Sequence, residues 1–590
     1  MLRLTNLSVP LDYTEESLRL LIRQKLKLDP DQLRSFEVSR RSVDARNKSD
    51  VHFVLSVDLS LKDEKTPLRY NKYLSLCKDN QPKGSGKDNR LKGFCKDDLS
   101  SGARKDDQPN GSGKGNWPGR TQNDRPKRVG KDNQPKGSGK DNRPKGSRGR
   151  SESPLVIGAG PSGLFAALTL ARSGANPTLI ERGKPVDRRT SDVLLLQEKG
   201  ELDPNSNVQF GEGGAGAFSD GKLTCGIKSP HVRTILETFV AHGAPPEILI
   251  DQKPHIGTDR LKSVVSSIRE EIISLGGTVL FETRLEELII RNEHIEGAVL
   301  SQGGERREFL TDTILLCIGH SARDTVQALF SQGVRMEQKP FAMGVRIEHP
   351  RRMIDRAQYG AFAGHPALGA ASYKLICHTP DGRGVYTFCM CPGGEVIAAA
   401  SQSGGVVTNG MSYHARNGEN SNSALLVGVR PEDFGDSHPL AGFILQRGIE
   451  KAAFRAGGGA FRAPAQRVGD FLADKPSVAF GKVVPTYRPS VTPADLRDVL
   501  PAFITDNLKK GIRAMNAQLT GFSDPDAVLT GPETRSSSPV RFSRTPTGEA
   551  EGLHGLFPVG EGAGYAGGIV SAAADGITAA LNALNAHIFR

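Results

Sequence analysis

Cysteine and long apolar runs are scarce in this chain, and each scarcity excludes a class of protein. Seven cysteines in 590 residues are too few for the disulfide framework of a small secreted protein. No uninterrupted apolar stretch is long enough to span a bilayer, and Met1–Asn6 contains no positively charged stretch followed by an apolar run. We therefore expect a cytoplasmic protein with neither a signal peptide nor a membrane contact.

Glutamate is absent from residues 78–150, and this segment carries the positive charge of the chain. It holds 20 Lys and Arg against 9 Asp, whereas the rest of the chain holds 58 basic and 57 acidic residues. Its sequence is a degenerate nine-residue repeat, clearest as Lys-Asp-Asn-Gln-Pro-Lys-Gly-Ser-Gly, with almost nothing apolar. Such a segment cannot bury enough surface to offset its ordering entropy, and it lacks the inward apolar residues of a β-solenoid. We interpret it as a disordered insert, more simply a linker than a binding segment, whose attraction for nucleic acid is weak and salt-dependent.

The remaining sequence predicts an α/β protein with three structured parts. Leu2–Leu7 and the alternating run from Val51 are predicted strands, and Thr14 is predicted to cap a helix between them. From Pro154 onward, short β-branched runs alternate with helical stretches, and many Gly and Pro with several strands follow. A small N-terminal α/β domain is predicted over residues 1–76, followed by the basic insert over 77–150. A Rossmann-like domain is predicted in two parts, 151–335 and 531–590, with a β-rich domain inserted between them over 336–530.

A glycine-rich turn after a short apolar run is the first chemical signal. Leu155–Ile157 is predicted as a buried parallel strand, and a Gly-x-Gly-x-x-Gly turn follows it at Gly158–Gly163. These glycines allow a tight turn, close approach of a pyrophosphate and packing of the next helix, expected over 163–173, on the sheet. Glu181 ends the next apolar run, where an acid binds the adenosine ribose and disfavours the 2′-phosphate of NADP.

A second glycine-rich signal lies about 400 residues later, at Phe557–Gly568. FAD is long and must be held at both of its ends, so a glycine signal at each end of a domain predicts an FAD site in a glutathione-reductase-type fold. Gly560 and Glu561 would lie near the ribityl and pyrophosphate portion. The amides at the start of a helix over 568–586 would face the pyrimidine edge of the flavin and stabilise negative charge there.

Three further segments are candidates for the same site. The apolar run Thr313–Gly319 is predicted to return the chain to the Rossmann-like domain, with His320 filling space beside the cofactor rather than acting in catalysis. Phe210–Lys222 contains too much glycine for a packed element, and we expect it to wrap the flavin or its diphosphate. Cys389 and Cys391 would point to one face of a strand, as redox-active or metal-binding thiols or, in the favoured interpretation, as buried structural cysteines.

A second complete nucleotide-binding unit is absent from the sequence. No other strand, Gly-x-Gly-x-x-Gly turn and acid occur in order, and no Cys-x-x-x-x-Cys dithiol is present. NAD(P)H would therefore reach the flavin without a Rossmann domain of its own, or the electrons come from the substrate or from another protein. We expect no metal site, because no second Cys or His pair at zinc spacing accompanies the two cysteines.

Several motifs in order give the chain a resemblance to a known family. It resembles the FAD-dependent dehydrogenases, also named NAD(P)/FAD-dependent oxidoreductases, of bacteria and plastids, whose reaction is largely undefined. The resemblance covers nearly the whole chain except residues 78–150. At this position, members of the family normally have only a short linker. The matching segments are Ser42–Arg46, Val156–Pro161, Asn207–Gly214, Lys253–Asp259, Gly319–Asp324, Gly344–Pro350, Phe388–Gly394, Thr408–Ser412 and Gly560–Gly568.

The resemblance implies an FAD-binding fold with an N-terminal small domain and a distinctive C-terminal substrate-side domain. Glu561 stands where other flavoproteins carry Asp, and Glu is normal for this family. The residues predicted to bind FAD, non-covalently, are Gly158, Ala159, Gly160, Pro161, Ser162, Gly163, Glu181, Arg182, Gly213, Gly214, Gly319, His320, Gly560, Glu561, Gly567, Gly568 and Ile569.

The leading hypothesis is an FAD-dependent oxidoreductase that transfers a hydride between the flavin and a small molecule. Weak candidates for an acid, base or anion clamp on the substrate side are Lys222, His255, Arg346 and His349, and each is equally well explained as a structural or surface residue. One alternative is a flavin-dependent RNA-modifying enzyme, which the basic insert motivates. The other is an FAD-binding scaffold without turnover.

Overall fold

The computed structural model describes residues 2–62, 74–76 and 153–588. The predicted insert at 77–150 lies outside these residues. None of the described helices is long and apolar enough to cross a membrane.

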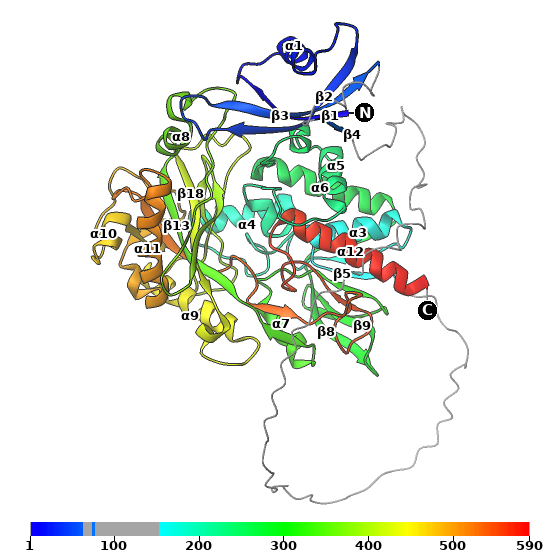
Figure 1. Ribbon diagram of the computed structural model, residues 1–590. Helices are drawn as coiled ribbons and strands as arrows, with labels where there is room; N and C mark the ends of the chain where they lie inside the picture. Colours follow the sequence, from blue (N-terminus) through cyan, green and yellow to red (C-terminus); the bar gives the residue numbers. More distant parts are fainter. Residues whose placement is uncertain (1, 63–73, 77–152, 589–590) are drawn as a thin grey trace, which may run out of the picture. The chain divides into compact units, whose positions relative to one another are not determined.

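The N-terminal part is an antiparallel sheet with one helix packed on it (Figure 1). Helix α1 (Glu15–Leu26) begins after Thr14, whose Oγ1 accepts a hydrogen bond from the amide of Ser17 at 3.2 Å, and it buries Leu18 and Ile22. The predicted helix and the predicted strands on either side of it are confirmed. In spatial order the strands are β2 (Leu33–Asp44), β3 (His52–Leu61), β1 (Leu2–Val9) and β4 (Leu74–Leu76).

Five short parallel strands form the central sheet of the second part. Their spatial order is β23 (Leu556–Pro558), β11 (Ile314–Leu316), β5 (Leu155–Ile157), β6 (Thr178–Ile180) and β7 (Thr278–Leu280). Side chains alternate between the faces, and both faces are buried, which accounts for the apolar runs of the sequence. After β5 and the first glycine turn, the chain therefore returns to this sheet four times, at β6, β7, β11 and β23.

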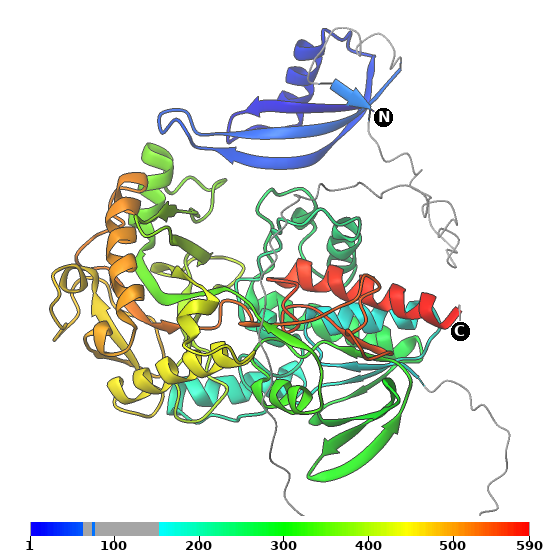
Figure 2. The same cartoon turned by 60° about the horizontal axis from the view of Figure 1, so that its bottom comes forward.

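The two faces of this sheet are covered by different layers. Val156, Leu315 and Phe557 belong to one core with helices α3 (Pro161–Arg172), α5 (His231–Ala241), α6 (Thr258–Ser274) and α12 (Ile569–Ile588). Leu155 and Leu316 belong to another core with a three-stranded antiparallel sheet and helix α7 (Arg323–Ser331). The strands of that sheet are β8 (Thr283–Arg291), β9 (His294–Gln302) and β10 (Glu305–Leu310). Figure 2 shows α12 beside α3 on one side and the small sheet on the other.

A seven-stranded sheet forms most of the segment predicted to be β-rich. Its strands pair antiparallel except for one parallel pair, β19 with β20, and helix α11 (Ala502–Gln518) packs on it. The predicted boundary at residue 530 falls inside its strand β21, and the division into domains stays a prediction. In spatial order the strands are β14 (Ile376–His378), β15 (Gly384–Cys391), β18 (Asn420–Val429), β13 (Phe341–Pro350), β21 (Val528–Glu533), β19 (Ala463–Arg467) and β20 (Val491–Pro493).

Smaller elements connect these layers. Two strand pairs lie outside the larger sheets: β12 (Met336–Gln338) with β22 (Val540–Phe542), and β16 (Glu395–Ala398) with β17 (Thr408–Met411). The remaining α-helices described are α4 (Val186–Lys199), α8 (Arg351–Tyr359), α9 (Ala441–Ala456) and α10 (Val468–Leu472).

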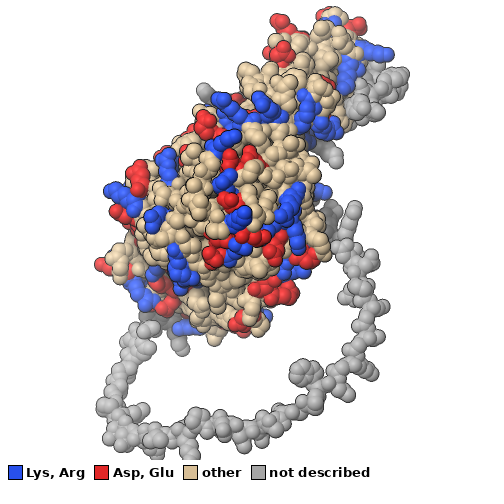
Figure 3. All heavy atoms as spheres, turned by 90° about the vertical axis from the view of Figure 1, so that its left-hand side faces the viewer, with Lys and Arg blue, Asp and Glu red and all other residues tan. Residues whose placement is uncertain are grey.

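Charges of both signs are mixed over the face of the molecule shown in Figure 3. This mixture agrees with the near-equal numbers of acidic and basic residues outside the repeat segment. On the face shown, no stripe of basic side chains of the kind that follows a nucleic-acid backbone stands out.

The close packing of α3 on the sheet depends on glycine. A Cβ added at Gly163 would lie 1.8 Å from the carbonyl oxygen of Gly158, and a Cβ at Gly158 would lie 2.5 Å from the carbonyl oxygen of Cys317. Both obstacles are backbone atoms, which cannot swing away as a flexible side chain does. Helix α3 begins at Pro161, two residues earlier than predicted, so Gly163 lies in its first turn.

We predict that Gly163→Ala destabilises the protein by about 2 kcal/mol or more, because the helix must move off the strand end to admit the methyl group. The matched control is Gly448→Ala in α9, where a Cβ would meet nothing within 4 Å. That variant should be stabilised by about 0.5–1 kcal/mol, because alanine loses less backbone entropy on folding. Thermal unfolding followed by circular dichroism measures both, and equal shifts of Tm would contradict the prediction.

Candidate functional site

A cavity of about 310 Å³ lies at the carboxyl ends of the central strands, within the size range of small-molecule sites. The two glycine signals, separated by about 400 residues in the sequence, both contribute to its wall. The predicted site residues that line it are Gly158, Gly160, Pro161, Ser162, Glu181, Arg182, Gly214, Gly319, His320, Glu561, Gly567, Gly568 and Ile569. The lining does not include the predicted residues Ala159, Gly163, Gly213 and Gly560.

The N-terminus of α3 faces the cavity without a side-chain cap. Gly160 is the N-cap residue, Pro161 opens the helix, and no side chain hydrogen-bonds to this end. Gly214 packs against Gly160, where a Cβ added to Gly214 would lie 3.1 Å from the Cα of Gly160. An uncapped helix end with positive dipole and open backbone amides is suited to an anion.

Glu181 is buried beside this turn and binds backbone rather than side chains. Its Oε2 accepts a hydrogen bond from Ala159 N at 2.8 Å, and its Oε1 accepts from Gly183 N and Gly211 N, both at 2.9 Å. A carboxylate offers about four lone-pair sites, so three amide donors leave capacity for one more. The same side chain therefore organises the loop and still borders the cavity.

The second glycine turn is held by α12. The amide of Gly560 donates to Asp575 Oδ2 at 2.7 Å, so this amide is already bonded inside the protein. A Cβ at Gly562 would lie 2.3 Å from the carbonyl oxygen of Gly319. The backbone of this turn therefore packs directly against the loop after β11. Burial raises the pKa of Glu561, which lines the cavity, to about 7.

The glycine-rich segment 210–222 is packed, contrary to the expectation of a loop too rich in glycine to pack. It contains a short 3₁₀ helix, Gly214–Phe218, and much of it is buried. The cause is Arg189 of α4, a fully buried side chain that donates to four carbonyl oxygens, those of Asn207, Val208, Glu212 and Gly214, at 2.6–2.9 Å. The guanidinium replaces a regular hydrogen-bond ladder. Burial lowers its pKa to about 10, so it stays charged at neutral pH.

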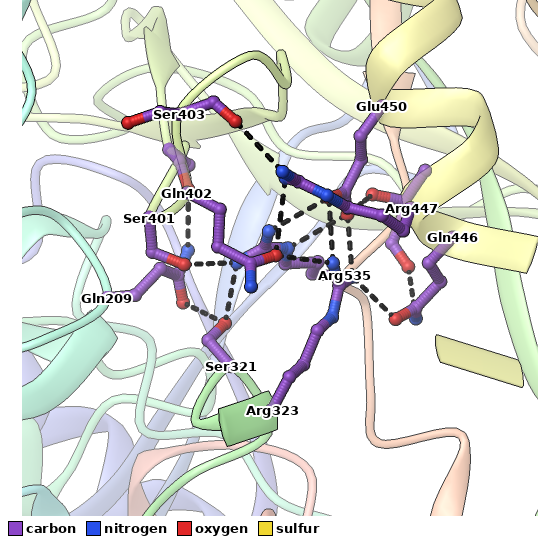
Figure 4. A network of polar contacts seen from close by, with 12 residues as sticks. Gln209, Ser321, Arg323, Ser401, Gln402, Ser403, Gln446, Arg447, Glu450 and Arg535 are labelled. Carbon is purple, nitrogen blue, oxygen red and sulfur yellow. Dashed lines mark hydrogen bonds and ion pairs between the residues drawn. The ribbon is translucent and has the colours of Figure 1, made fainter. Parts of the chain in front are cut away.

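A network of buried ion pairs lies behind one wall of the cavity (Figure 4). Glu450 of α9 accepts hydrogen bonds from Arg323 of α7 and from Arg535, at 2.7–3.0 Å. Burial alone would raise the pKa of Glu450, but the two guanidinium ions hold it well below its ordinary value. Arg535 lines the cavity and also donates to Ser401 Oγ at 2.6 Å. Two cations share one carboxylate, so this wall carries a surplus of positive charge.

The histidine predicted beside the cofactor is fixed by the same wall. His320 donates from Nε2 to the carbonyl oxygen of Arg535 at 2.7 Å. Burial lowers the pKa of His320 to about 4, so the ring is neutral at pH 7. A neutral, hydrogen-bonded imidazole in the lining agrees with the expectation that it fills space there.

The four weak catalytic candidates do not all reach the cavity, although the backbones of Lys222 and His255 pair in a β-bridge. Lys222 lines the cavity, whereas His255, Arg346 and His349 are not among its lining residues. His255 stacks on His414, and burial lowers its pKa to about 4. His349 is fully buried and donates from Nε2 to the carbonyl oxygen of Phe522 at 2.9 Å.

Arg346 is fully buried behind the wall and is paired with Glu533. Its guanidinium donates to this carboxylate at 2.5 and 3.1 Å, and Glu533 lines the cavity. Burial raises the pKa of Glu533 to about 7 in spite of Arg346. Glu533 and Glu561 are therefore two lining carboxyls that can exchange protons near neutral pH.

The cysteine pair differs from the expectation for a regular strand. A bulge interrupts the pairing of β15 with β18 between Phe388 and Cys391, and Cys389 adopts φ +42°. Cys391 is buried, whereas Cys389 is partly exposed and lines the cavity. The expectation of two buried structural cysteines on one strand face is therefore wrong for Cys389, because the bulge breaks the alternation of side chains.

Sequence reasoning missed several lining residues, among them Gln209, Asn409, Glu533, Arg535 and Ser536. They come from elements that meet only in the folded chain, and none has a spacing that marks it in the sequence. Glu533 and Arg535 do follow an apolar run, Ala527–Leu529, which is the signal that could have placed them at the end of a strand.

Two family models and one relative of high identity match the chain. The family model "FAD-dependent protein, C-terminal domain-like" matches residues 340–536, and a model for a domain of unknown function matches residues 1–60. An uncharacterised protein of Clostridium beijerinckii is 49% identical over 428 residues, which span 72% of this chain and 80% of the relative.

Solved structures of flavoproteins match the chain only weakly. A glycerol-3-phosphate dehydrogenase from Bacillus halodurans complexed with FAD is 12% identical, covers 73% of this chain and 65% of its own, and has a TM-score of 0.31. An L-amino acid deaminase from Proteus myxofaciens is 10% identical, covers 75% of this chain and 92% of its own, and has a TM-score of 0.33. Both TM-scores are too low to support an inference about this chain.

The family assignment rests on the sequence matches. High identity to the Clostridium protein spans most of both chains, and the C-terminal family model covers the segment that forms the seven-stranded sheet. The chain belongs to the family of FAD-dependent proteins that share this C-terminal domain.

Proposed function

We propose that this protein is an FAD-dependent oxidoreductase that holds FAD non-covalently in the cavity and transfers a hydride between the flavin and a small molecule. The observation that carries the proposal is that both glycine turns line one cavity. A glutathione-reductase-type fold is part of the proposal, and the parallel sheet with helices on one face and a small antiparallel sheet on the other supports it.

The first glycine turn would hold the adenosine and pyrophosphate half of FAD. The uncapped end of α3 offers open amides to the pyrophosphate, and the remaining acceptor capacity of Glu181 suits a ribose hydroxyl. A 2′-phosphate would face the Glu181 carboxylate, so the site favours FAD over NADP. Arg182 lies at the same edge, stacked on Phe210 with its guanidinium carbon 4.2 Å from the ring centroid.

The second glycine turn and α12 would hold the flavin end. Gly567, Gly568 and Ile569 line the cavity where α12 begins, and the positive end of its dipole favours negative charge on a reduced ring. When bound, FAD supplies the two-electron redox chemistry, and the protein positions and tunes it.

Proton transfer to or from the substrate would come from the lining carboxyls rather than from the buried histidines. Glu533 and Glu561 have pKa values raised to about 7, which is the range in which a general acid or base works at neutral pH. Lys222 supplies a cation in the same wall for an anionic group of the substrate. NADH or NADPH would reach the flavin through the cavity mouth as electron donor.

We predict that Glu181→Gln weakens FAD binding at least about tenfold, because a neutral amide replaces an ionised acceptor of three amide donors. Equilibrium titration of the apoprotein with FAD, followed by flavin fluorescence, measures the affinity. Glu198→Gln, an exposed position on α4, is the matched control and should bind FAD like the wild type. Equal affinities in a folded Glu181→Gln protein would contradict this site.

The oxidoreductase activity itself is tested anaerobically. Adding NADH or NADPH to the flavin-loaded protein should bleach the visible flavin absorption, and admitting oxygen should restore it. A flavin that neither nicotinamide nor a panel of small reduced substrates can bleach would overturn the proposal in favour of a scaffold.

His349 provides a pH prediction that separates a structural from a catalytic histidine. Burial lowers its pKa to about 4, and its Nδ1 has no hydrogen-bond partner within the described part of the chain. The pKa of a histidine in an unfolded chain is about 6.5. Below that pH the unfolded state therefore binds a proton that the folded state does not bind. This contribution to stability is complete above about pH 6.5 and is lost as the pH falls towards 4.

Thermal unfolding at pH 7 and pH 5 should therefore show a larger loss of Tm in the wild type than in His349→Gln. The exposed His378→Gln is the control and should follow the wild type. If His349→Gln loses as much Tm as the wild type, the imidazole is charged in the folded protein.

A further inference from the structure

The cysteine pair is placed at the cavity by a local distortion of β15. Cys389 lies at the bulge with φ +42°, a backbone conformation that is strained for a non-glycine residue. The distortion turns Cys389 into the lining of the cavity. Strain of this kind persists where the surrounding structure requires it, and it is concentrated at functional sites.

The two cysteines are in direct contact. The Cys391 thiol donates to the carbonyl oxygen of Cys389 at 3.3 Å. One thiol, Cys389, is open to the cavity, while the other, Cys391, is fully buried behind it. This is the arrangement of an attacking sulfur with a resolving partner.

The charges around the pair leave a positive surplus. Lys222 and Arg416 share the buried carboxylate of Asp220, at 3.0 and 2.5 Å, and Arg346 pairs with Glu533. Three cations therefore face two carboxylates. The Arg346 guanidinium also donates to the carbonyl oxygen of Cys389 at 2.9 Å. Because Glu533 is protonated in part near pH 7, the surplus is at least one positive charge, and it favours a negative charge on sulfur.

Other titratable groups near the pair do not cancel this positive surplus in full. Glu561 and Tyr373 are also close enough to interact with the two sulfurs, and Lys339 pairs electrostatically with Glu561. Burial raises the pKa of Glu561 to about 7 and raises that of Tyr373, so both are neutral in part or entirely near pH 7. Neither therefore supplies the missing charge in full.

The thiol chemistry agrees with this geometry. The hydrogen bond from Cys391 and the charges of Lys222 and Arg346 lower the pKa of Cys389 well below its ordinary value, although burial opposes them. The pKa of Cys391 is raised by the same partner and by burial. Among the described residues, no group of three His, Cys, Asp or Glu is arranged to hold a metal, so a redox role is favoured over a metal site.

We propose that Cys389 and Cys391 are a redox-active dithiol that exchanges two electrons with the flavin. The proposal rests on the FAD site proposed above. In the forward direction, the Cys389 thiolate and the Cys391 thiol form a disulfide, and two electrons and the Cys391 proton pass to oxidised flavin, which gives the singly protonated reduced flavin. The reverse step reduces the disulfide. The substrate of this dithiol would be a thiol or disulfide, either a small molecule or a group on a protein, that reaches Cys389 through the cavity.

The first experiment measures the thiols without requiring flavin. The full chain, as purified, is treated with iodoacetamide at pH 6 and analysed by peptide mass spectrometry over time. We expect Cys389 to be alkylated at least about tenfold faster than Cys377, which is also partly exposed, and Lys222→Met to slow Cys389 selectively. In a separate sample that has not been alkylated, oxidised glutathione should give a peptide 2 Da lighter, with Cys389 joined to Cys391. A rate no faster than that of Cys377, or no such peptide, would overturn the proposal.

The second experiment measures electron exchange with the flavin. Under anaerobic conditions, dithiothreitol should bleach the flavin of the loaded wild type at least about tenfold faster than that of Cys389→Ser or Cys391→Ser, with Cys377→Ser behaving as the wild type. Equal rates in all four proteins would overturn the dithiol role. A protein that binds no FAD would defeat the proposed function instead, and the alkylation experiment would still report on the cysteine pair by itself.

Discussion

The structure depends on a set of contacts in which backbone meets backbone with no side chain between. Gly158 lies against the carbonyl of Cys317, Gly562 against that of Gly319, and Gly576 of α12 against that of Ser162, with added Cβ atoms 2.1–2.5 Å from those oxygens. These contacts join the ends of β5, β11 and β23 to one another and the start of α3 to the middle of α12. A cavity can therefore form at the strand ends with helix termini in its wall, and any side chain at these positions would force the layers apart.

Buried charges fix the remaining walls. Arg189 supplies the hydrogen bonds that a glycine-rich segment cannot make for itself, and Glu450 ties Arg323 of α7 to Arg535, which lines the cavity. Burying such ions costs free energy that hydrophobic residues would not, and removing one partner of a buried pair costs about 3–5 kcal/mol. Their contribution is a defined arrangement, which suits a site that must hold a long cofactor at two ends and keep a substrate between them. The surplus cations in these walls are consistent with an anionic ligand.

The parts of the fold that follow local rules were predictable from the sequence. Leu155–Ile157 with its glycine turn, the capped helix after Thr14 and the start of α12 follow periodicity, capping and turn chemistry, all of which act over a few residues. What could not be predicted needs the tertiary structure. Arg189 looks like any surface arginine of an amphipathic helix, and Glu533 and Arg535 come into the site only through sheet pairing. The bulge that turns Cys389 into the cavity breaks the alternation on which a strand prediction relies.

The central claim is that one cavity holds FAD by both of its ends, and the identity of the bound molecule tests it most directly. The purified full chain would be denatured, and the released ligand identified by chromatography and mass spectrometry against the protein concentration. We predict one FAD per chain, or stoichiometric uptake of FAD by protein purified without it. No flavin after reconstitution, or FMN bound as tightly as FAD, would contradict the account, because FMN lacks the adenosine end that the first glycine turn is proposed to hold.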